Sequence, residues 1–207
     1  MPARPDLVVR ITERGHKEGR IGPMNSWPID TLQKGDVYVA DGFGKITDGT
    51  LIGDNLGNAI FAKSKTGVVF DAGARDLEGL ARIPGFNAFV RGWDPSYLQQ
   101  SMLMSINQPI RIGQATVFPG DVVLAKREGV IFIPPQFVED LVINAEFIQL
   151  RDEFGIPIVL VSHALDEVIR LADTLVLVDA GRVHACGDVD DIMGNLDVSA
   201  THGQSRD

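Results

Sequence analysis

Apolar and polar positions alternate in short blocks along the middle of the chain, and these blocks predict strands and helices in turn. Apolar runs bounded by glycine and aspartate predict strands at 35–42 and 67–72, and helical spacing between them predicts a helix around 56–64. A second helix, with an acidic first turn, is predicted over 76–83. Strands that alternate with helices in this way indicate an α/β domain.

The pattern changes further along the chain. Several short strands are predicted between residues 86 and 135, separated by turns such as Pro-Gly-Asp at 119–121. Apolar residues at helical spacing then predict one long helix over 135–155, which ends at Gly155. Residues 156–183 have the pattern of strand, helix and strand, which predicts a compact βαβ-like unit with parallel strands.

The two ends of the chain lack such periodicity. Residues 1–29 mix glycine, proline and charge, which predicts an irregular segment. The polar residues 193–207 predict a disordered tail. The sequence therefore predicts four parts: the irregular segment 1–29, an α/β domain over 30–155, an appendage over 156–192 and the tail.

Composition narrows the classes of partner and compartment. The 207 residues are 44% hydrophobic and 23% charged, which is typical of a globular protein, and the net charge of −9 argues against nucleic acid or an anionic membrane as the main partner. Cys186 is the single cysteine, so an internal disulfide framework and a cysteine-rich zinc site are excluded. The apolar runs are too short to span a bilayer. We therefore expect a cytoplasmic protein.

Candidate chemistry follows the two strands that precede helices. Asp54 lies in the turn Ile-Gly-Asp-Asn-Leu-Gly, and Arg75 and Asp76 lie in the turn after the next strand. Adjacent strand ends in an α/β sheet commonly share one crevice. Backbone N–H groups after Asp54 and the planar guanidinium of Arg75 suit a carboxylate, and Asp54 with Asp76 suits a hard divalent cation.

A purely structural interpretation of the same residues is also open. Asp76 can cap the following helix, and Arg75 can form a surface ion pair. The residue pattern by itself does not choose between a ligand site and a capped turn.

A family resemblance bears on this choice. The segments GDNLG (53–57), GVVFDAGARDLEGL (67–80) and VFPGDVVLAKREGVIFIPP (117–135) resemble the family of the regulator of ribonuclease activity A and the 4-hydroxy-4-methyl-2-oxoglutarate aldolases. The resemblance covers roughly residues 30–155. Aldolases of that family carry an aspartate, twenty intervening residues and then Arg-Asp, a spacing that Asp54, Arg75 and Asp76 match.

The resemblance implies a layered, swivelling β/β/α-type domain and a role for each residue of the two turns. The substrate-binding residues would be Gly53, Asp54, Asn55, Leu56 and Arg75, which would hold the pyruvoyl part of the substrate. Arg75 and Asp54 would be catalytic, and Asp76 with Asp54 would organise Mg²⁺ or Mn²⁺ through water.

The implied reaction is metal-dependent retro-aldol cleavage of a 4-hydroxy-2-oxo acid with release of pyruvate, and oxaloacetate decarboxylation is a related reaction of the same site. The resemblance also implies a homo-oligomer, a trimer or hexamer, with sites between subunits. An acidic residue of the neighbouring subunit would take part, for which Glu128, Glu139, Glu146 and Glu153 are all open. The alternative within the family is a non-catalytic protein that binds and regulates a ribonuclease.

The C-terminal part resembles a different family. Residues 156–192 resemble the C-terminal part of the ATP-binding subunits of ABC transporters, in which His163 would be the switch histidine. The sequence contains no G-x-x-x-x-G-K-[ST] phosphate loop, so an ATP-coupled function is the least favoured hypothesis, and His163 is interpreted as a packing or capping residue. The abrupt change at residue 155 suggests a fusion or a chimeric gene.

Overall fold

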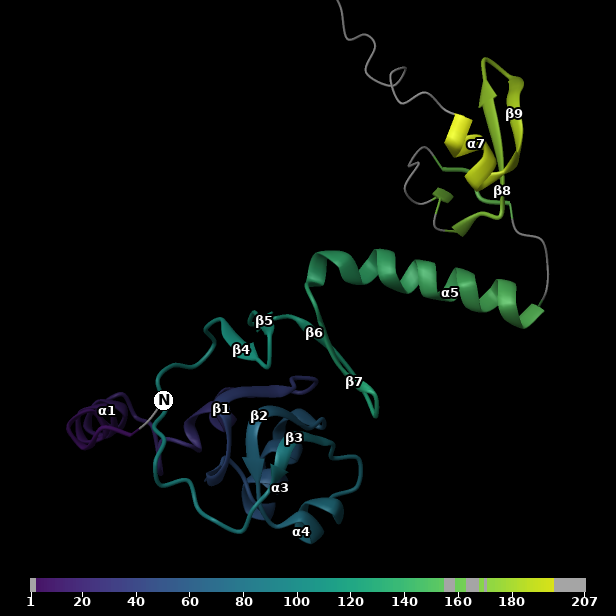
Figure 1. Ribbon diagram of the computed structural model, residues 1–207. Helices are drawn as coiled ribbons and strands as arrows, with labels where there is room; N and C mark the ends of the chain where they lie inside the picture. The colour runs from purple at the N-terminus through teal and green to yellow at the C-terminus, as the bar shows by residue number, and fades with distance from the viewer. Residues whose placement is uncertain (1–2, 155–158, 163–167, 170, 196–207) are drawn as a thin grey trace, which may run out of the picture. The chain divides into compact units, whose positions relative to one another are not determined.

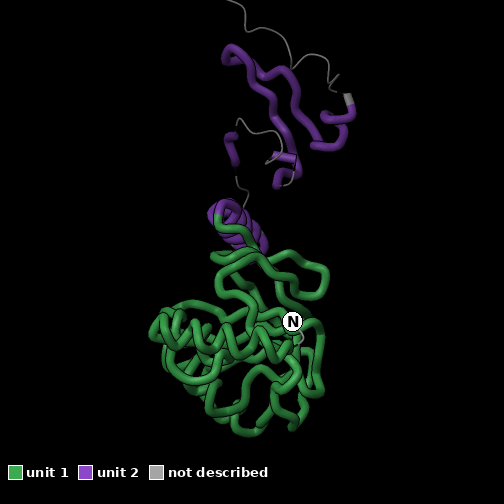
Figure 2. Tube along the Cα trace, turned by 90° about the vertical axis from the view of Figure 1, so that its left-hand side faces the viewer, with its two compact units in different colours: residues 1–135 green, residues 136–207 purple. Residues whose placement is uncertain are grey.

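The structure is a computed structural model that describes residues 3–154, 159–162, 168–169 and 171–195. Its contacts divide the chain into two compact units, residues 1–135 and 136–207 (Figure 2), and Figure 1 labels the helices and strands. The domain boundary predicted at residue 155 falls on a residue outside the described ranges, and it stays a prediction.

A three-stranded parallel sheet forms the centre of the first unit. Its strands are β1 (Tyr38–Thr50), β2 (Val68–Ala74) and β3 (Ala88–Trp93), in the order β1-β2-β3. Helices α3 (Asp54–Ser64) and α4 (Leu77–Ala81) connect them and lie on one side of the sheet (Figure 1). Every residue of β2 is buried, as expected for a strand with neighbours on both edges. The predicted α/β class is confirmed.

The hydrophobic core lies between this sheet and the two helices. Its buried members come from α2, α3, β2, α4 and the segments that follow β1 and α4, and they are Ile29, Ile52, Ile60, Val68, Phe70, Ala72, Ala74, Leu80 and Ile83. The turns that lead from β1 into α3 and from β2 into α4 lie next to this core, and its close packing restrains their positions.

Strand β1 is longer than the predicted strand at 35–42. It runs to Thr50, and its pairing with β2 shifts register between Asp41 and Thr50, where Phe43 and Asp48 have positive φ. Irregular pairing of this kind hides the period of two on which strand prediction relies.

Two antiparallel hairpins complete the first unit. They are β4 (Ile110–Ile112) with β5 (Ala115–Val117), and β6 (Val122–Lys126) with β7 (Gly129–Ile133). The buried carboxylate of Asp71 on β2 accepts hydrogen bonds from Arg91 Nε and, at 3.2 Å, from the N–H of Gly113 in the β4–β5 turn. It thereby fastens this hairpin to the central sheet.

The charge of Asp71 is stabilised by these partners. Burial by itself would raise its pKa, but the hydrogen bonds from Arg91 and Gly113 and the charges of Arg91 and Arg111 outweigh burial, so the pKa of Asp71 lies below its ordinary value.

The prediction of an irregular segment over 1–29 is wrong for much of its length. Helix α1 (Pro5–Lys17) and the beginning of α2 (Trp27–Thr31) lie there. Pro5 occupies the first turn of α1, basic residues close its last turn, and Gly15 lets the Trp27 ring pack against the helix. Gly15 is required for this contact, but in the sequence a glycine at this position disfavours the prediction of a helix.

The second unit contains one long helix and a hairpin. The 3-10 turn η1 (Pro135–Phe137) leads into α5 (Val138–Phe154), and β8 (Thr174–Asp179) pairs with β9 (Arg182–Asp188), which is followed by α7 (Val189–Asn195). The long predicted helix is thus confirmed.

The parallel βαβ-like pairing predicted for residues 156–183 is not seen in the described part of the chain. Strand β8 pairs antiparallel with β9, since positive φ at Ala180 and Gly181 turns the chain back on itself, and residues 159–162 form no strand. The remainder of the predicted first strand and most of the predicted helix lie outside the described residues. The predicted disordered tail, beyond Asn195, also lies outside them. Among the described residues, no helix is both long and apolar enough to cross a membrane.

Candidate functional site

The register of the sheet brings the two turns of interest together. Thr50 at the end of β1 is opposite Gly73 near the end of β2, so both chains leave the sheet at the same level. Beyond the strands, the N–H of Arg75 donates to the carbonyl of Ile52 at 3.0 Å. This contact sets Gly53 and the start of α3 directly beside Arg75 and Asp76.

Asp76 acts across the gap between the turns. Its Oδ2 accepts a hydrogen bond from the N–H of Asp54 at 3.3 Å, whereas its side chain makes no cap to its own helix α4. The backbone of Asp76 is left-handed (φ 58°, ψ 45°), a conformation that aspartate tolerates better than most residues. Asp76 is the N-cap residue of α4, as the structural interpretation expected, and its carbonyl accepts from the N–H of Leu80 at 2.9 Å. Its carboxylate, however, lies at the start of the neighbouring helix α3.

Asp54 is the first residue of α3. Its Oδ1 accepts from the N–H of Asn55 at 2.7 Å, and its carbonyl accepts from the side-chain amide of Asn58 at 2.9 Å. The other carboxylate oxygen points towards the first turn of α4, because a Cβ built on Gly79 would lie 2.8 Å from Asp54 Oδ2. Both aspartates thus stand where α3 and α4 begin.

Two glycines make this close approach possible. A Cβ on Gly53 would overlap Asp76 Oδ2 and lie 3.0 Å from Arg75 Nε, and a Cβ on Gly79 would lie 2.6 Å from that of Asp54. The site therefore requires glycine at both positions for space, not for backbone conformation.

Arg75 is held on two sides and open on a third. Its Nε lies 3.5 Å from Asp76 Oδ2, and its Cζ lies 5.4 Å from the centroid of the Tyr97 ring. Its side chain is 26% exposed, and among the described residues its Nη atoms have no hydrogen-bond partner. A planar guanidinium with free Nη groups matches a carboxylate.

The residues present suit a divalent cation only in part. Asp54 and Asp76 offer the hard oxygen ligands that Mg²⁺ and Mn²⁺ prefer. Within the described ranges, no group of three or more Asp, Glu, His or Cys residues could hold a metal. Two carboxylates fit a cation that keeps several waters, as Mg²⁺ commonly does.

Anion-binding capacity is added by the start of α3. Asp54 and Asn55 donate their N–H groups to carboxylates, and the first bond within the helix is from Gly57 to Gly53. Leu56 lies between Asn55 and Gly57 in the first turn of α3, where the N–H groups have no acceptor within the helix. The N–H of Leu56 is therefore a candidate donor to an anion.

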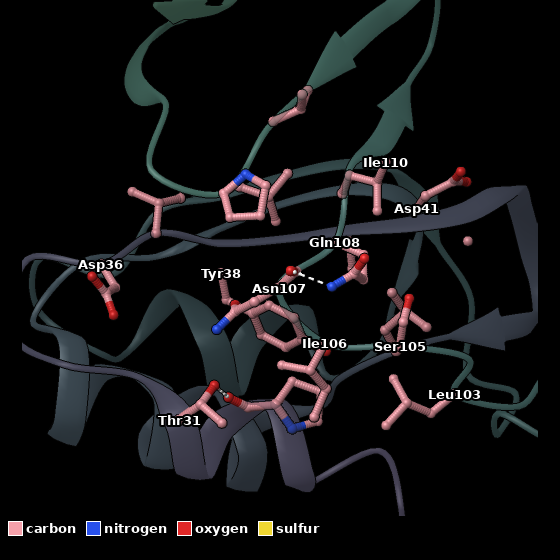
Figure 3. A pocket seen from close by; sticks show the side chains of 18 of the residues that line it. Thr31, Asp36, Tyr38, Asp41, Leu103, Ser105, Ile106, Asn107, Gln108 and Ile110 are labelled. Atoms are coloured by element: carbon pink, nitrogen blue, oxygen red, sulfur yellow. Dashed lines mark hydrogen bonds between the residues drawn. The ribbon is translucent and has the colours of Figure 1, made fainter. Parts of the chain in front are cut away.

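A cavity of about 830 Å³ in the first unit lies apart from this site (Figure 3). It is bounded by α2, the first half of β1 and the segment 101–108, and none of the predicted site residues lines it. The buried Oδ1 of Asn25, which has no hydrogen-bond partner in the described part of the chain, belongs to its wall. The predicted site is therefore separate from this cavity and lies at the turns that follow β1 and β2.

The sequence pattern did not indicate a role for Gly79, Tyr97 or Asp71. A glycine inside a predicted helix is a weak signal of close packing, and an aspartate inside an apolar strand is a signal of a buried ion pair. Tyr97 carries no local signal, because its contact with Arg75 depends on how the loop after β3 folds. His163 lies outside the described residues.

Comparison with protein families identifies the first unit. The family model of RraA-like proteins, described as Aldolase/RraA, matches residues 22–132, which is more than half of the chain. The chain therefore belongs to the RraA-like family.

Solved structures support the same fold. RraAS2 of Streptomyces coelicolor, described as an unusual member of the RNase ES inhibitor RraA protein family, superposes with a TM-score of 0.60 at 24% identity, covering 75% of this chain and 70% of that one. An uncharacterized protein of Pseudomonas syringae pv. tomato superposes with a TM-score of 0.56 at 24% identity, covering 64% and 62%. At this level of identity the likeness concerns the fold alone.

Part of the chain is similar to proteins of a different class, the ATP-binding proteins of molybdenum import. The molybdenum import ATP-binding protein ModC of Paramagnetospirillum magneticum is 39% identical over 88 residues, and that of Brucella abortus is 53% identical over 55 residues. These matches cover 42% and 27% of this chain but only 23% and 15% of the relatives. The chain thus contains a short part of a ModC-like sequence, in agreement with the resemblance of residues 156–192.

Proposed function

We propose that the RraA-like unit is a divalent-metal-dependent lyase that cleaves a 4-hydroxy-2-oxo acid and releases pyruvate, with oxaloacetate decarboxylation as a second reaction. The observation that carries the proposal is the convergence of Asp54, Arg75 and Asp76, with the Nη groups of Arg75 open to an anion. The family includes aldolases, and the spacing of these residues matches their motif.

Substrate binding follows from the groups at the two turns. The carboxylate and 2-oxo oxygens of the substrate would accept from Arg75 Nη and from the N–H of Leu56 at the start of α3. Both donors are fixed, since α3 rests on the core and Arg75 is held by Asp76 and Tyr97. Fixed donors need little reorganisation as the charge of the substrate changes.

Bond cleavage places charge where these groups lie. The bond between C3 and C4 breaks as a proton leaves the 4-hydroxyl group, and its electron pair remains on the three-carbon fragment as the enolate of pyruvate. Arg75 stabilises that negative charge, and protonation at C3 then gives pyruvate. The carboxylates of Asp54 and Asp76 provide the nearby proton acceptors, directly or through water.

Asp54 and Asp76 would hold the Mg²⁺ or Mn²⁺ ion. When bound, such an ion supplies Lewis-acid stabilisation of negative oxygen.

The test is an assay of pyruvate release from a 4-hydroxy-2-oxo acid and from oxaloacetate, with Mg²⁺, with Mn²⁺ and with chelator. Arg75→Ala should lower kcat/KM by about 100-fold or more, as loss of one charge-stabilising donor does. Arg82→Ala is the matched control, since Arg82 closes α4 and its side chain is 80% exposed. Activity of the wild type that Arg75→Ala leaves unchanged would contradict the proposal. Absence of activity together with capture of a ribonuclease would favour the regulatory alternative.

The ModC-like part is not assigned a nucleotide function. The ATP-binding relatives are matched over less than a quarter of their length, and the sequence has no phosphate loop. Calorimetric titration with MgATP should give no binding heat.

A further inference from the structure

The loop after β3 is hydrogen-bonded to the other two strands of the sheet, β2 and β1. The N–H of Asp94 donates to the carbonyl of Ala74 at 3.1 Å, at the end of β2. Thr47 Oγ1 donates to Asp94 Oδ2 at 3.0 Å, and the N–H of Asp48 donates to Ser96 Oγ at 2.7 Å, both from β1. Thr50 Oγ1 also donates to the carbonyl of Ser96. The loop 94–96 is therefore anchored at the end of the sheet that carries the site.

Asp94 organises this loop from within. Its Oδ1 accepts from the N–H of Ser96 at 2.9 Å, and hydrogen bonds from Ser96 and Thr47 hold the pKa of Asp94 below its ordinary value. Asp94 is thus charged at neutral pH. Because the hydrogen bonds of residues 94–96 restrain the backbone, the position of the next residue, Tyr97, is restrained as well.

The Tyr97 ring lies against the guanidinium of Arg75. The separation of 5.4 Å between Arg75 Cζ and the ring centroid is that of a cation–π pair, and the ring is half-exposed. The interaction engages the face of the Tyr97 ring and takes up none of the N–H groups of Arg75 as hydrogen-bond donors. Asp76 approaches Nε at 3.5 Å, so the ring and the carboxylate together restrain Arg75 without engaging its Nη atoms.

We propose that Tyr97 is a positioning residue, whose ring holds the guanidinium of Arg75 with the Nη edge free for the carboxylate of a 2-oxo acid. The identity of the anion rests on the proposed function, whereas the hold on Arg75 rests on the contacts described above. The ring, not the hydroxyl group, does the holding, so phenylalanine should serve as well as tyrosine and leucine should not.

The first experiment needs no substrate. Full-length wild type, Tyr97→Phe and Tyr97→Leu are treated with phenylglyoxal, and modification of Arg75 is followed by peptide mass spectrometry with the exposed Arg82 as internal reference. Tyr97→Leu should raise the rate at Arg75 about threefold to tenfold relative to Arg82, and Tyr97→Phe should match wild type. Equal rates at Arg75 in all three proteins would overturn the proposal.

The second experiment measures the consequence for binding. Calorimetry with pyruvate in the presence of Mg²⁺, and steady-state oxaloacetate decarboxylation, should show Kd and KM raised about fivefold in Tyr97→Leu, a smaller change in kcat, and wild-type values in Tyr97→Phe. Loss in Tyr97→Phe equal to that in Tyr97→Leu would overturn the role of the ring. A wild type that neither binds pyruvate nor releases it would refute the lyase, while the labelling result would still decide whether Tyr97 holds Arg75.

Discussion

The N–H of Asp54 lies 3.3 Å from Oδ2 of Asp76, so a carboxylate carried by the turn after β2 meets the first residue of the helix after β1. The two residues are 22 positions apart in sequence. Their contact makes one polar site of two separate turns, and it places Asp76 between the start of α3 and Arg75.

Gly53→Ala should disrupt this site. The added methyl group would overlap Asp76 Oδ2 and press on Arg75, so we expect about 1–3 kcal/mol of lost stability and pyruvate release reduced by about 100-fold. Gly129→Ala is the matched control, because nothing lies within 4 Å of a Cβ there, and its stability should stay within about 0.5 kcal/mol of wild type. Thermal unfolding and the pyruvate assay measure both effects; similar behaviour of the two variants would contradict the steric argument.

Asp76→Asn should weaken cation binding while the fold persists. Asparagine keeps an oxygen for the N–H of Asp54 but removes the charge, so the affinity for Mn²⁺ should fall by about 10- to 100-fold. Electron paramagnetic resonance of free Mn²⁺ measures the affinity. Glu78→Gln removes a carboxylate that is 91% exposed on the same helix and should change little. Equal losses in both variants would indicate a general charge effect.

Asp71→Asn should destabilise the first unit. It removes a buried charge that binds Arg91 and the Gly113 amide, and hydrogen bonds to charged groups contribute about 1.5–3 kcal/mol. Urea unfolding should show a lower midpoint, and the free energy of unfolding derived from it should be smaller by that amount. Asp30→Asn, at an exposed ion pair with Lys63, serves as the comparison and should cost less than about 1 kcal/mol.

Acid should destabilise the protein partly through the same residue. The pKa of Asp71 is lower in the folded state than in the unfolded chain, so the unfolded chain binds more protons between the two values. The stabilisation is therefore complete above the unfolded value, near 3.9, and is lost as the pH falls through the lower folded value. Urea midpoints measured from pH 6 downwards should fall less steeply in Asp71→Asn; parallel curves would contradict this assignment.

The β6–β7 hairpin should take part in self-association. Leu124 and Ile131 are paired across it and are 48% and 59% exposed, and exposed apolar pairs of this kind mark contact surfaces. We expect an oligomer by light scattering, and Leu124→Glu should weaken association by roughly 30-fold, about 2 kcal/mol. Lys126→Glu, on the same strand, is the control for charge. A wild-type monomer at all concentrations would contradict the expectation.

The sequence predicted the elements that have strong local patterns and missed those created by contacts. The order of strand and helix around residues 54–83 follows from apolar runs and helix-start signals. The position of Asp54, Arg75 and Asp76 after two successive strands indicated that these groups lie close together. Helix α1 was missed because Gly15, needed for packing with Trp27, interrupts its pattern. Tyr97 was missed because the anchoring of loop 94–96 by Thr47 and Thr50 joins residues far apart in sequence.

The pairing of Thr50 with Gly73 has a consequence for how this site can change. Neighbouring strands lie about 4.8 Å apart, and both turns begin within three residues of that pair. The spacing of the two strands therefore fixes the distance between the two turns. Residues in the turns can therefore be substituted, and the chemistry of the site changed, without altering the distance between the two turns. A variant that has lost all activity can therefore keep the full geometry, and a different reaction can be installed on the same spacing.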